Sequence, residues 1–206
     1  MTRGPTGPAP APPADLHARP LPLTIWDAGS TVVRIHRTRH APIHFSGGAG
    51  KPPLGRWDSP TGIFGALYAA REFPGAFAET VLRNPAQLLV SLTEIEARAL
   101  SVLGITIAIR LVDLTGPGLS QLGLDARILS GPYDTCGAWS DALHGHREAP
   151  AGILYPSRFD PAQVCVALFD RVAAHVEVVT APAPLGDMLA DVAEVLDRYG
   201  KALDPA

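Results

Sequence analysis

Four short apolar segments, each bounded by turn-forming residues, constrain the fold of this chain more than any other feature. They are TVVRIH (31–36), FGALYAA (64–70), GILYPS (152–157) and VCVALFD (164–170). Runs of this length that are rich in apolar and β-branched residues are typical of buried strands. ITIAIRLVDLT (105–115) is predicted to be a further strand, and the alternating HVEVV (175–179) an edge strand.

Helical segments stand between these strands at irregular intervals. Thr93 and Glu96 have the spacing of a capping box, and Gly200 is a typical stop for the last, amphipathic helix. Helices are predicted over 74–84, 93–103, 133–145 and about 186–200. Because the spacing lacks the regular strand–helix–strand repeat of a doubly wound sheet, we predict an α+β fold made of a single mixed domain.

The first 22 residues differ from the rest in composition. They are rich in proline and alanine, and proline fixes φ and removes a hydrogen-bond donor. We therefore predict a disordered tail over 1–22 and a domain over 23–206, a length that suits one domain with a full core. A loop rich in glycine and proline is predicted over 41–55.

Composition and charge exclude several classes of protein. Hydrophobic residues make up 47% of the chain, which excludes a disordered protein. The formal net charge of −3 disfavours direct nucleic-acid binding through bulk positive charge. The sequence has no run of eighteen apolar residues, so no membrane span is predicted. Cys136 and Cys165 form no CxxC motif, so we expect reduced thiols in a cytoplasmic protein.

Familiar catalytic and metal-binding motifs are absent from the sequence. It contains no GxGxxG, no Walker loop and no GxSxG. His36, His40 and His44 are spaced to share a helix face, as metal ligands do. Pro42 and the β-branched run before His36 disfavour a helix there, so we predict no metal site.

Five polar residues remain as candidates for a dispersed site: Arg34, Arg56, Tyr68, Glu79 and Ser157. Each also has an ordinary structural interpretation. Arg34 would be a strand residue that points to solvent, Arg56 a solvated charge in a loop, and Tyr68 a core residue. The glutamate would lie on the solvent-exposed side of a helix, and the serine in a turn. Residue chemistry alone leaves both interpretations open.

The order VVRIHR … GRWDSPTGIFGALYAAREFPGAFAE … GILYPSRFD … VCVALFD resembles the RES domain family, which is named for an arginine, a glutamate and a serine. The resemblance extends over about 32–170 and rests on the GRW motif, the LY pair and the GILYPSR segment. It implies an ADP-ribosyltransferase-like core. It also places the family's residues at Arg34, Arg56, Tyr68, Glu79 and Ser157.

The resemblance implies a function as well as a fold. RES proteins act on NAD, which is their substrate, so no separate cofactor is expected. Many are bacterial toxins that cleave the nicotinamide–ribose bond by hydrolysis, or by phosphorolysis with inorganic phosphate. Their usual partner is an Xre-type helix-turn-helix antitoxin. The alternatives are an ADP-ribosyltransferase that modifies a protein and a catalytically inactive RES-fold binding module.

These roles fit the chemistry of the five side chains. Arg34 and Arg56 can grip the diphosphate of NAD through bidentate hydrogen bonds, and Tyr68 can stack on nicotinamide. Glu79 can stabilise the cation that develops on the ribose, and nicotinamide leaves as a neutral molecule without a general acid. The expected catalytic residues are therefore Glu79, Arg56 and Tyr68, while Ser157 is expected to bond a phosphate or ribose oxygen.

Overall fold

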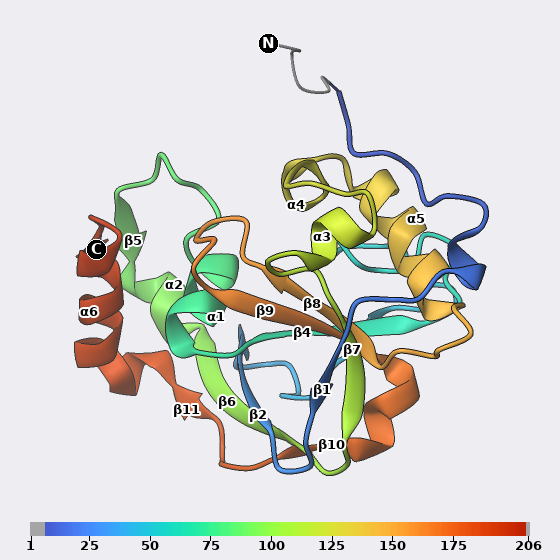
Figure 1. Ribbon diagram of the computed structural model, residues 1–206. Coiled ribbons are helices and arrows are strands. Elements are labelled where there is room, and N and C mark those ends of the chain that lie inside the picture. The colour runs from blue at the N-terminus through green and yellow to red at the C-terminus, as the bar shows by residue number, and fades with distance from the viewer. Residues whose placement is uncertain (1–6, 205–206) are drawn as a thin grey trace.

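The computed structural model describes residues 7–204, and its centre is a curled mixed sheet (Figure 1). The strand order is β1-β7-β8-β9-β4-β2-β6-β10, with β11 added to β6 and β3 to β4. Among the described pairs of this sheet, β7 and β8 run parallel and the others antiparallel. The strands are β1 Leu23–Trp26, β2 Thr31–Arg37, β3 Ser46–Gly47, β4 Gly65–Ala70, β6 Arg98–Ile105, β7 Ile109–Asp113, β8 Gly152–Pro156, β9 Val164–Phe169, β10 Val176–Val178 and β11 Ala183–Pro184.

Short helices surround this sheet, and a second sheet pairs β5 (Leu89–Ser91) with β12 (Ala202–Asp204) in parallel. The α-helices are α1 Phe73–Thr80, α2 Leu92–Glu96, α3 Gly118–Gln121, α4 Arg127–Ser130, α5 Tyr133–His144 and α6 Leu189–Arg198. The 3-10 helices are η1 Leu16–Ala18, η2 Asp170–His175 and η3 Leu185–Met188. None of the helices in residues 7–204 has the length and apolar character needed to cross a bilayer.

Alternation along the central strands builds a hydrophobic core on each face of the sheet. On one face, side chains such as Ile153 and Ala167 pack with Phe77 of α1, Trp139 of α5 and Leu196 of α6. On the other face, side chains from β1, β2, β4, β6, β7, β8 and β9 form a second cluster, which the curl of the sheet encloses. Strands that are buried on both faces explain why their sequences are continuously apolar.

The predicted α+β class and most predicted strands are confirmed. The four apolar segments form β2, β4, β8 and β9, and HVEVV contributes the edge strand β10. The predicted helix over 93–103 is wrong beyond Glu96, because residues 98–105 form β6. Seven residues of β6 pair with β2, and this pairing outweighs the local helix signal. The predicted capping box at Thr93 is also wrong, because α2 begins after Ser91 and has no side-chain capping hydrogen bond. The predicted strand 105–115 is reduced to β7, because residues 106–108 turn the chain between two strands.

The prediction of a disordered tail over 1–22 is wrong for its described part, residues 7–22. Leu16 and Leu21 are buried, and the Pro10 carbonyl accepts a hydrogen bond from Trp139 Nε1 at 2.8 Å. The Leu16 carbonyl lies 3.2 Å from Nε2 of the buried His146. Prolines keep residues 9–13 extended, so the Pro10 carbonyl is free to accept a bond from the domain before the chain enters η1. Residues 1–6 of the predicted tail lie outside the described residues.

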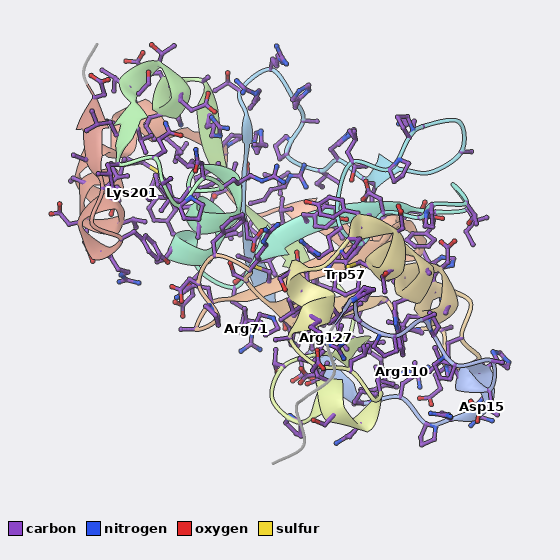
Figure 2. The ribbon with its side chains drawn as sticks, turned by 90° about the horizontal axis from the view of Figure 1, so that it is seen from above. Asp15, Trp57, Arg71, Arg110, Arg127 and Lys201 are labelled. Carbon is purple, nitrogen blue, oxygen red and sulfur yellow. The ribbon has the colours of Figure 1, made fainter. Side chains whose placement is uncertain are left out.

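The two terminal segments cover opposite ends of the molecule. Figure 2 shows Asp15 of the N-terminal segment far from Lys201 of the C-terminal segment, with Trp57 between them. The N-terminal segment lies beside α5, and α6 packs near α1 and β5 (Figure 1). The candidate site lies between these two ends.

Candidate functional site

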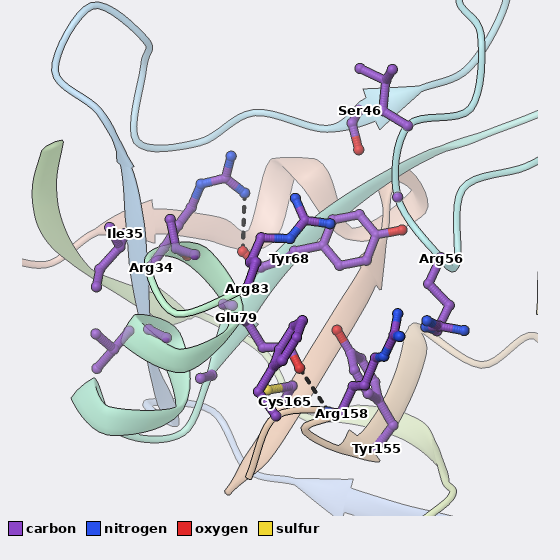
Figure 3. A pocket seen from close by; sticks show the side chains of 18 of the residues that line it. Arg34, Ile35, Ser46, Arg56, Tyr68, Glu79, Arg83, Tyr155, Arg158 and Cys165 are labelled. Atoms are coloured by element: carbon purple, nitrogen blue, oxygen red, sulfur yellow. Dashed lines mark hydrogen bonds between the residues drawn. The ribbon is translucent and has the colours of Figure 1, made fainter. Parts of the chain in front are cut away.

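A cavity of about 550 Å³ lies against β2, β4 and α1 (Figure 3). Its size suits a small-molecule ligand. Seven arginines line it: Arg34, Arg37, Arg39, Arg56, Arg83, Arg98 and Arg158. Among its described lining residues there is one carboxylate, that of Glu79. Arg37 and Arg98 form ion pairs with Glu94, which lies outside the lining. The other five arginines make the cavity electropositive, although the whole chain carries a net negative charge.

The cavity lies where two neighbouring strands separate. β2 and β4 share a single paired position, Val33 with Ala70. Across the opening beyond this pair, Arg34 Nη1 donates a hydrogen bond of 3.1 Å to the Tyr68 carbonyl. The side chain of Arg34 thus bridges the two strands and reaches the cavity from β2 (Figure 3).

Arg34 is a partly buried cation without a carboxylate partner in residues 7–204. Its Nε is buried and has no hydrogen-bond partner there. Burial lowers the pKa of its guanidinium to about 10, so the group is still charged at neutral pH. A buried cation without a carboxylate partner is costly, and an anionic ligand in the cavity would pair with its charge.

Asp58 anchors the loop that carries the GRW motif. Its buried carboxylate accepts bonds from the Tyr68 hydroxyl at 2.8 Å, the Ser46 hydroxyl at 3.0 Å, and the backbone N–H groups of Leu54 and Gly55 at 2.9 and 2.8 Å. A Cβ on Gly55 would lie 2.4 Å from the Tyr68 hydroxyl oxygen, so only glycine allows this approach. The spacing of the motif follows from this packing.

The same contacts decide what Tyr68 offers to a ligand. Its hydroxyl donates to Asp58 and accepts a bond of 2.8 Å from the Trp57 N–H. Burial, and next the charge of Asp58, raise the pKa of the Tyr68 hydroxyl well above its ordinary value. Tyr68 therefore stays neutral with its hydroxyl engaged, and what it presents to the cavity is its ring.

Arg56 is held by neutral groups from the α4–α5 region. Its Nη1 donates to the Gly131 carbonyl at 2.9 Å and lies 3.4 Å from Cys136 Sγ. Its Cζ lies 4.8 Å from the ring centre of Tyr133. None of these partners is anionic, so the positive charge of Arg56 is available to a ligand.

Helix α1 brings Glu79 to the cavity, and Ser157 holds it there. Pro74 occupies the first turn of α1, and Phe77 packs into the core. Glu79 Oε1 accepts a bond of 2.7 Å from the Ser157 hydroxyl and one of 2.9 Å from the Arg158 N–H. Both donors meet at one oxygen, which fixes the direction of the carboxylate.

The structure gives Ser157 a contact different from the predicted one. Its side chain is 1% exposed and does not line the cavity, so it is not placed to touch a phosphate or ribose oxygen. Ser157 lies behind Glu79 and orients it. Arg34, Arg56, Tyr68 and Glu79, in contrast, all line the cavity.

The three regularly spaced histidines do not form one cluster. His36 is buried in β2, with Nε2 2.9 Å from the Ser101 hydroxyl. The rings of His40 and His44 stack with their centres 6.5 Å apart. Residues 7–204 contain no group of three or more His, Cys, Asp or Glu side chains placed to hold a metal ion.

Sequence reasoning missed several residues around the cavity. Asp58 had a signal, because it directly follows the GRW motif. Arg83 follows Glu79 by four residues, and Arg158 follows Ser157 directly, so both had a positional signal (Figure 3). Tyr133 had none, because its contact with Arg56 joins distant parts of the chain.

Three comparisons relate this chain to known proteins. The family model described as the RES domain matches residues 31–188. A protein of Sinorhizobium fredii (strain NBRC 101917 / NGR234), described as "Probable toxin y4kH", is 29% identical over 111 residues, which are 53% of this chain and 86% of that protein. A chain in the crystal structure of the M. tuberculosis MbcT-MbcA toxin-antitoxin complex is similar in fold. Its TM-score is 0.62 at 19% identity, over 82% of this chain and 90% of that one.

Proposed function

The protein belongs to the RES domain family, and we propose that it is a toxin that cleaves the nicotinamide–ribose bond of NAD. One observation carries this proposal. A cavity lined by seven arginines contains a single carboxylate, Glu79, among its described lining residues. The names of the relatives support the toxin role, because one is described as a probable toxin and the other comes from a toxin–antitoxin complex.

Binding of NAD would rest on Arg34, Arg56 and Tyr68. Figure 3 shows the two arginines on either side of the Tyr68 ring. Guanidinium groups match phosphate oxygens in a bidentate manner, so the two can hold the diphosphate. The Tyr68 ring, whose hydroxyl is engaged by Asp58, can stack on the nicotinamide.

Cleavage would rest on Glu79. As the bond between ribose and nicotinamide breaks, its electron pair leaves with the nicotinamide nitrogen and positive charge develops on the ribose. The carboxylate stabilises this charge, and Oε2 is the oxygen that can face the ribose because Ser157 and Arg158 engage Oε1. Nicotinamide leaves as a neutral molecule, so one carboxylate is enough. Water or inorganic phosphate then bonds to the ribose carbon.

We extend the proposal to location and partners. The toxin would act in the cytoplasm, where NAD is available, and would need no cofactor beyond this substrate. Its partner would be an antitoxin of the Xre helix-turn-helix type. The complex of the structural relative with its antitoxin supports the presence of such a partner.

Incubation of the purified protein with labelled NAD tests the proposal. Reactions run with and without inorganic phosphate, and with and without cell extract. Free ADP-ribose indicates hydrolysis, phosphorylated ADP-ribose indicates phosphorolysis, and labelled protein indicates ADP-ribosyl transfer. NAD that binds but remains intact in every reaction would contradict the proposal and favour an inactive binding module.

A further inference from the structure

The C-terminal segment contacts the loop that holds Glu79, although residues 189–204 lie beyond the stretch that the RES domain model matches. The segment consists of α6, a turn at residues 199–201, and β12, which pairs with β5. Tyr199 in this turn donates a hydrogen bond of 2.7 Å to Asp160 Oδ2. Asp160 belongs to the loop of residues 157–163, which connects β8 to β9 and is here called the Glu79-holding loop.

Asp160 connects Tyr199 to the donors that hold Glu79. Its backbone N–H donates to Ser157 Oγ at 3.3 Å, and the N–H of Phe159 donates to the same oxygen at 3.1 Å. The Ser157 hydroxyl in turn donates to Glu79. Tyr199 is therefore linked to the carboxylate in the cavity through Asp160, which it binds at the side chain and which binds Ser157 through its backbone N–H.

A second cavity shows why this hydrogen bond matters. It measures about 180 Å³ and lies between α1 and the C-terminal segment. Phe159 lines both cavities. The residues around the second cavity are Ala78, Leu82, Pro85, Leu88, Phe159, Tyr199 and Lys201. This cavity is partly open to solvent, so the side of Phe159 that lines it is not held by close packing against other protein atoms.

We propose that Tyr199 is a positioning residue for the reaction: by binding Asp160, it holds the Ser157 hydroxyl and the Arg158 N–H against Glu79. This rests on the proposed role of Glu79. Without the Tyr199 hydroxyl the loop can shift toward the second cavity, and the carboxylate is held less firmly in the transition state. The ring of Tyr199 still packs on the core, so the fold is retained.

Tyr199→Phe tests the proposal, because it removes one oxygen and leaves the ring. One hydrogen bond of this kind corresponds to a kcat lower by roughly three- to tenfold. KM for NAD should not change, because Arg34, Arg56 and Tyr68 are untouched. The matched control is Lys201→Ala in the same segment, whose amine donates to the carbonyls of Pro85 and Gln87 and not to the loop.

Amide hydrogen exchange provides a second measurement that does not depend on activity. The Arg158 N–H is bonded to Glu79, so its exchange should become faster in Tyr199→Phe and stay at the wild-type rate in Lys201→Ala. An unchanged exchange rate in Tyr199→Phe overturns the proposal, and so does a wild-type kcat. If the wild-type protein itself leaves NAD intact, the proposed function fails, and exchange alone then decides whether Tyr199 holds the loop.

Discussion

Asp58 accepts hydrogen bonds from four donors, and replacing it should destabilise the whole protein as well as the cavity. Asp58→Ala removes every acceptor at once. The Ser46 hydroxyl can still donate to the Ala66 carbonyl at 3.1 Å. The Tyr68 hydroxyl and the N–H groups of Leu54 and Gly55 lose their partner.

The size of the effect follows from these three orphaned donors. A buried donor without a partner costs about 1–3 kcal/mol. Leu54 is exposed, so water can reach part of the loop and lower the cost. We expect Asp58→Ala to lower the free energy of unfolding by about 3–6 kcal/mol. Asp58→Asn keeps an oxygen for the two backbone N–H groups, and the expected loss is about 1–3 kcal/mol.

Urea unfolding at neutral pH measures both losses as shifts of the midpoint at constant slope. Ser46→Ala is the control, because it removes a single donor to the same carboxylate and should cost about 1 kcal/mol or less. Asp58→Asn should also raise KM for NAD, since Tyr68 and the loop carrying Arg56 lose part of their support. An Asp58→Ala protein within 1 kcal/mol of wild type would refute this account of the anchor.

Three further predictions follow from other contacts. Arg56→Lys should raise KM for NAD about tenfold, because a lysine is a point charge and cannot bind the Gly131 carbonyl and a phosphate at the same time as a planar guanidinium can. Equal KM values would show that Arg56 is an ordinary loop charge that does not bind NAD. Deletion of residues 1–20 should lower Tm by about 5 °C or more, because it removes the buried Leu16 side chain and the Pro10 carbonyl that accepts a bond from Trp139. An unchanged melting curve would contradict the packing described here. Burial raises the pKa values of Tyr68 and Tyr155, so the folded protein retains protons that the unfolded chain loses near pH 10. Stability should therefore fall above about pH 10, by up to about 1.4 kcal/mol per pH unit for each tyrosine; a free energy of unfolding that stays constant from about pH 9 to 11 would show that these hydroxyls are not buried as described.

The parts of the fold that the sequence predicts are those that local pattern decides. The central strands are continuously apolar because both of their faces are buried, and this pattern is visible in the sequence. The start of β6 cannot be seen in the sequence, because the spacing of Thr93 and Glu96 gives a helix signal that only pairing with β2 overrides. Likewise, a segment rich in proline and alanine shows no periodicity even where its carbonyls bind the domain.

The candidate site divides in the same way. The five side chains were found through short motifs that can each be recognised locally in the sequence, and four of them line the cavity. The role of Ser157 was not predictable, because its partner Glu79 is 78 positions away and belongs to another element. The contact of Tyr199 with Asp160 joins the chain across 39 positions, and no local motif marks it.

Kinetics of Glu79→Gln test the central claim most directly. The amide is nearly the same size as the carboxylate, so the fold and NAD binding should be preserved. The charge that Glu79 stabilises exists only in the transition state, so kcat should fall by about a hundredfold or more while KM changes little. If Glu79→Gln melts normally and cleaves NAD at the wild-type rate, Glu79 is not the catalytic carboxylate and the proposed mechanism is wrong.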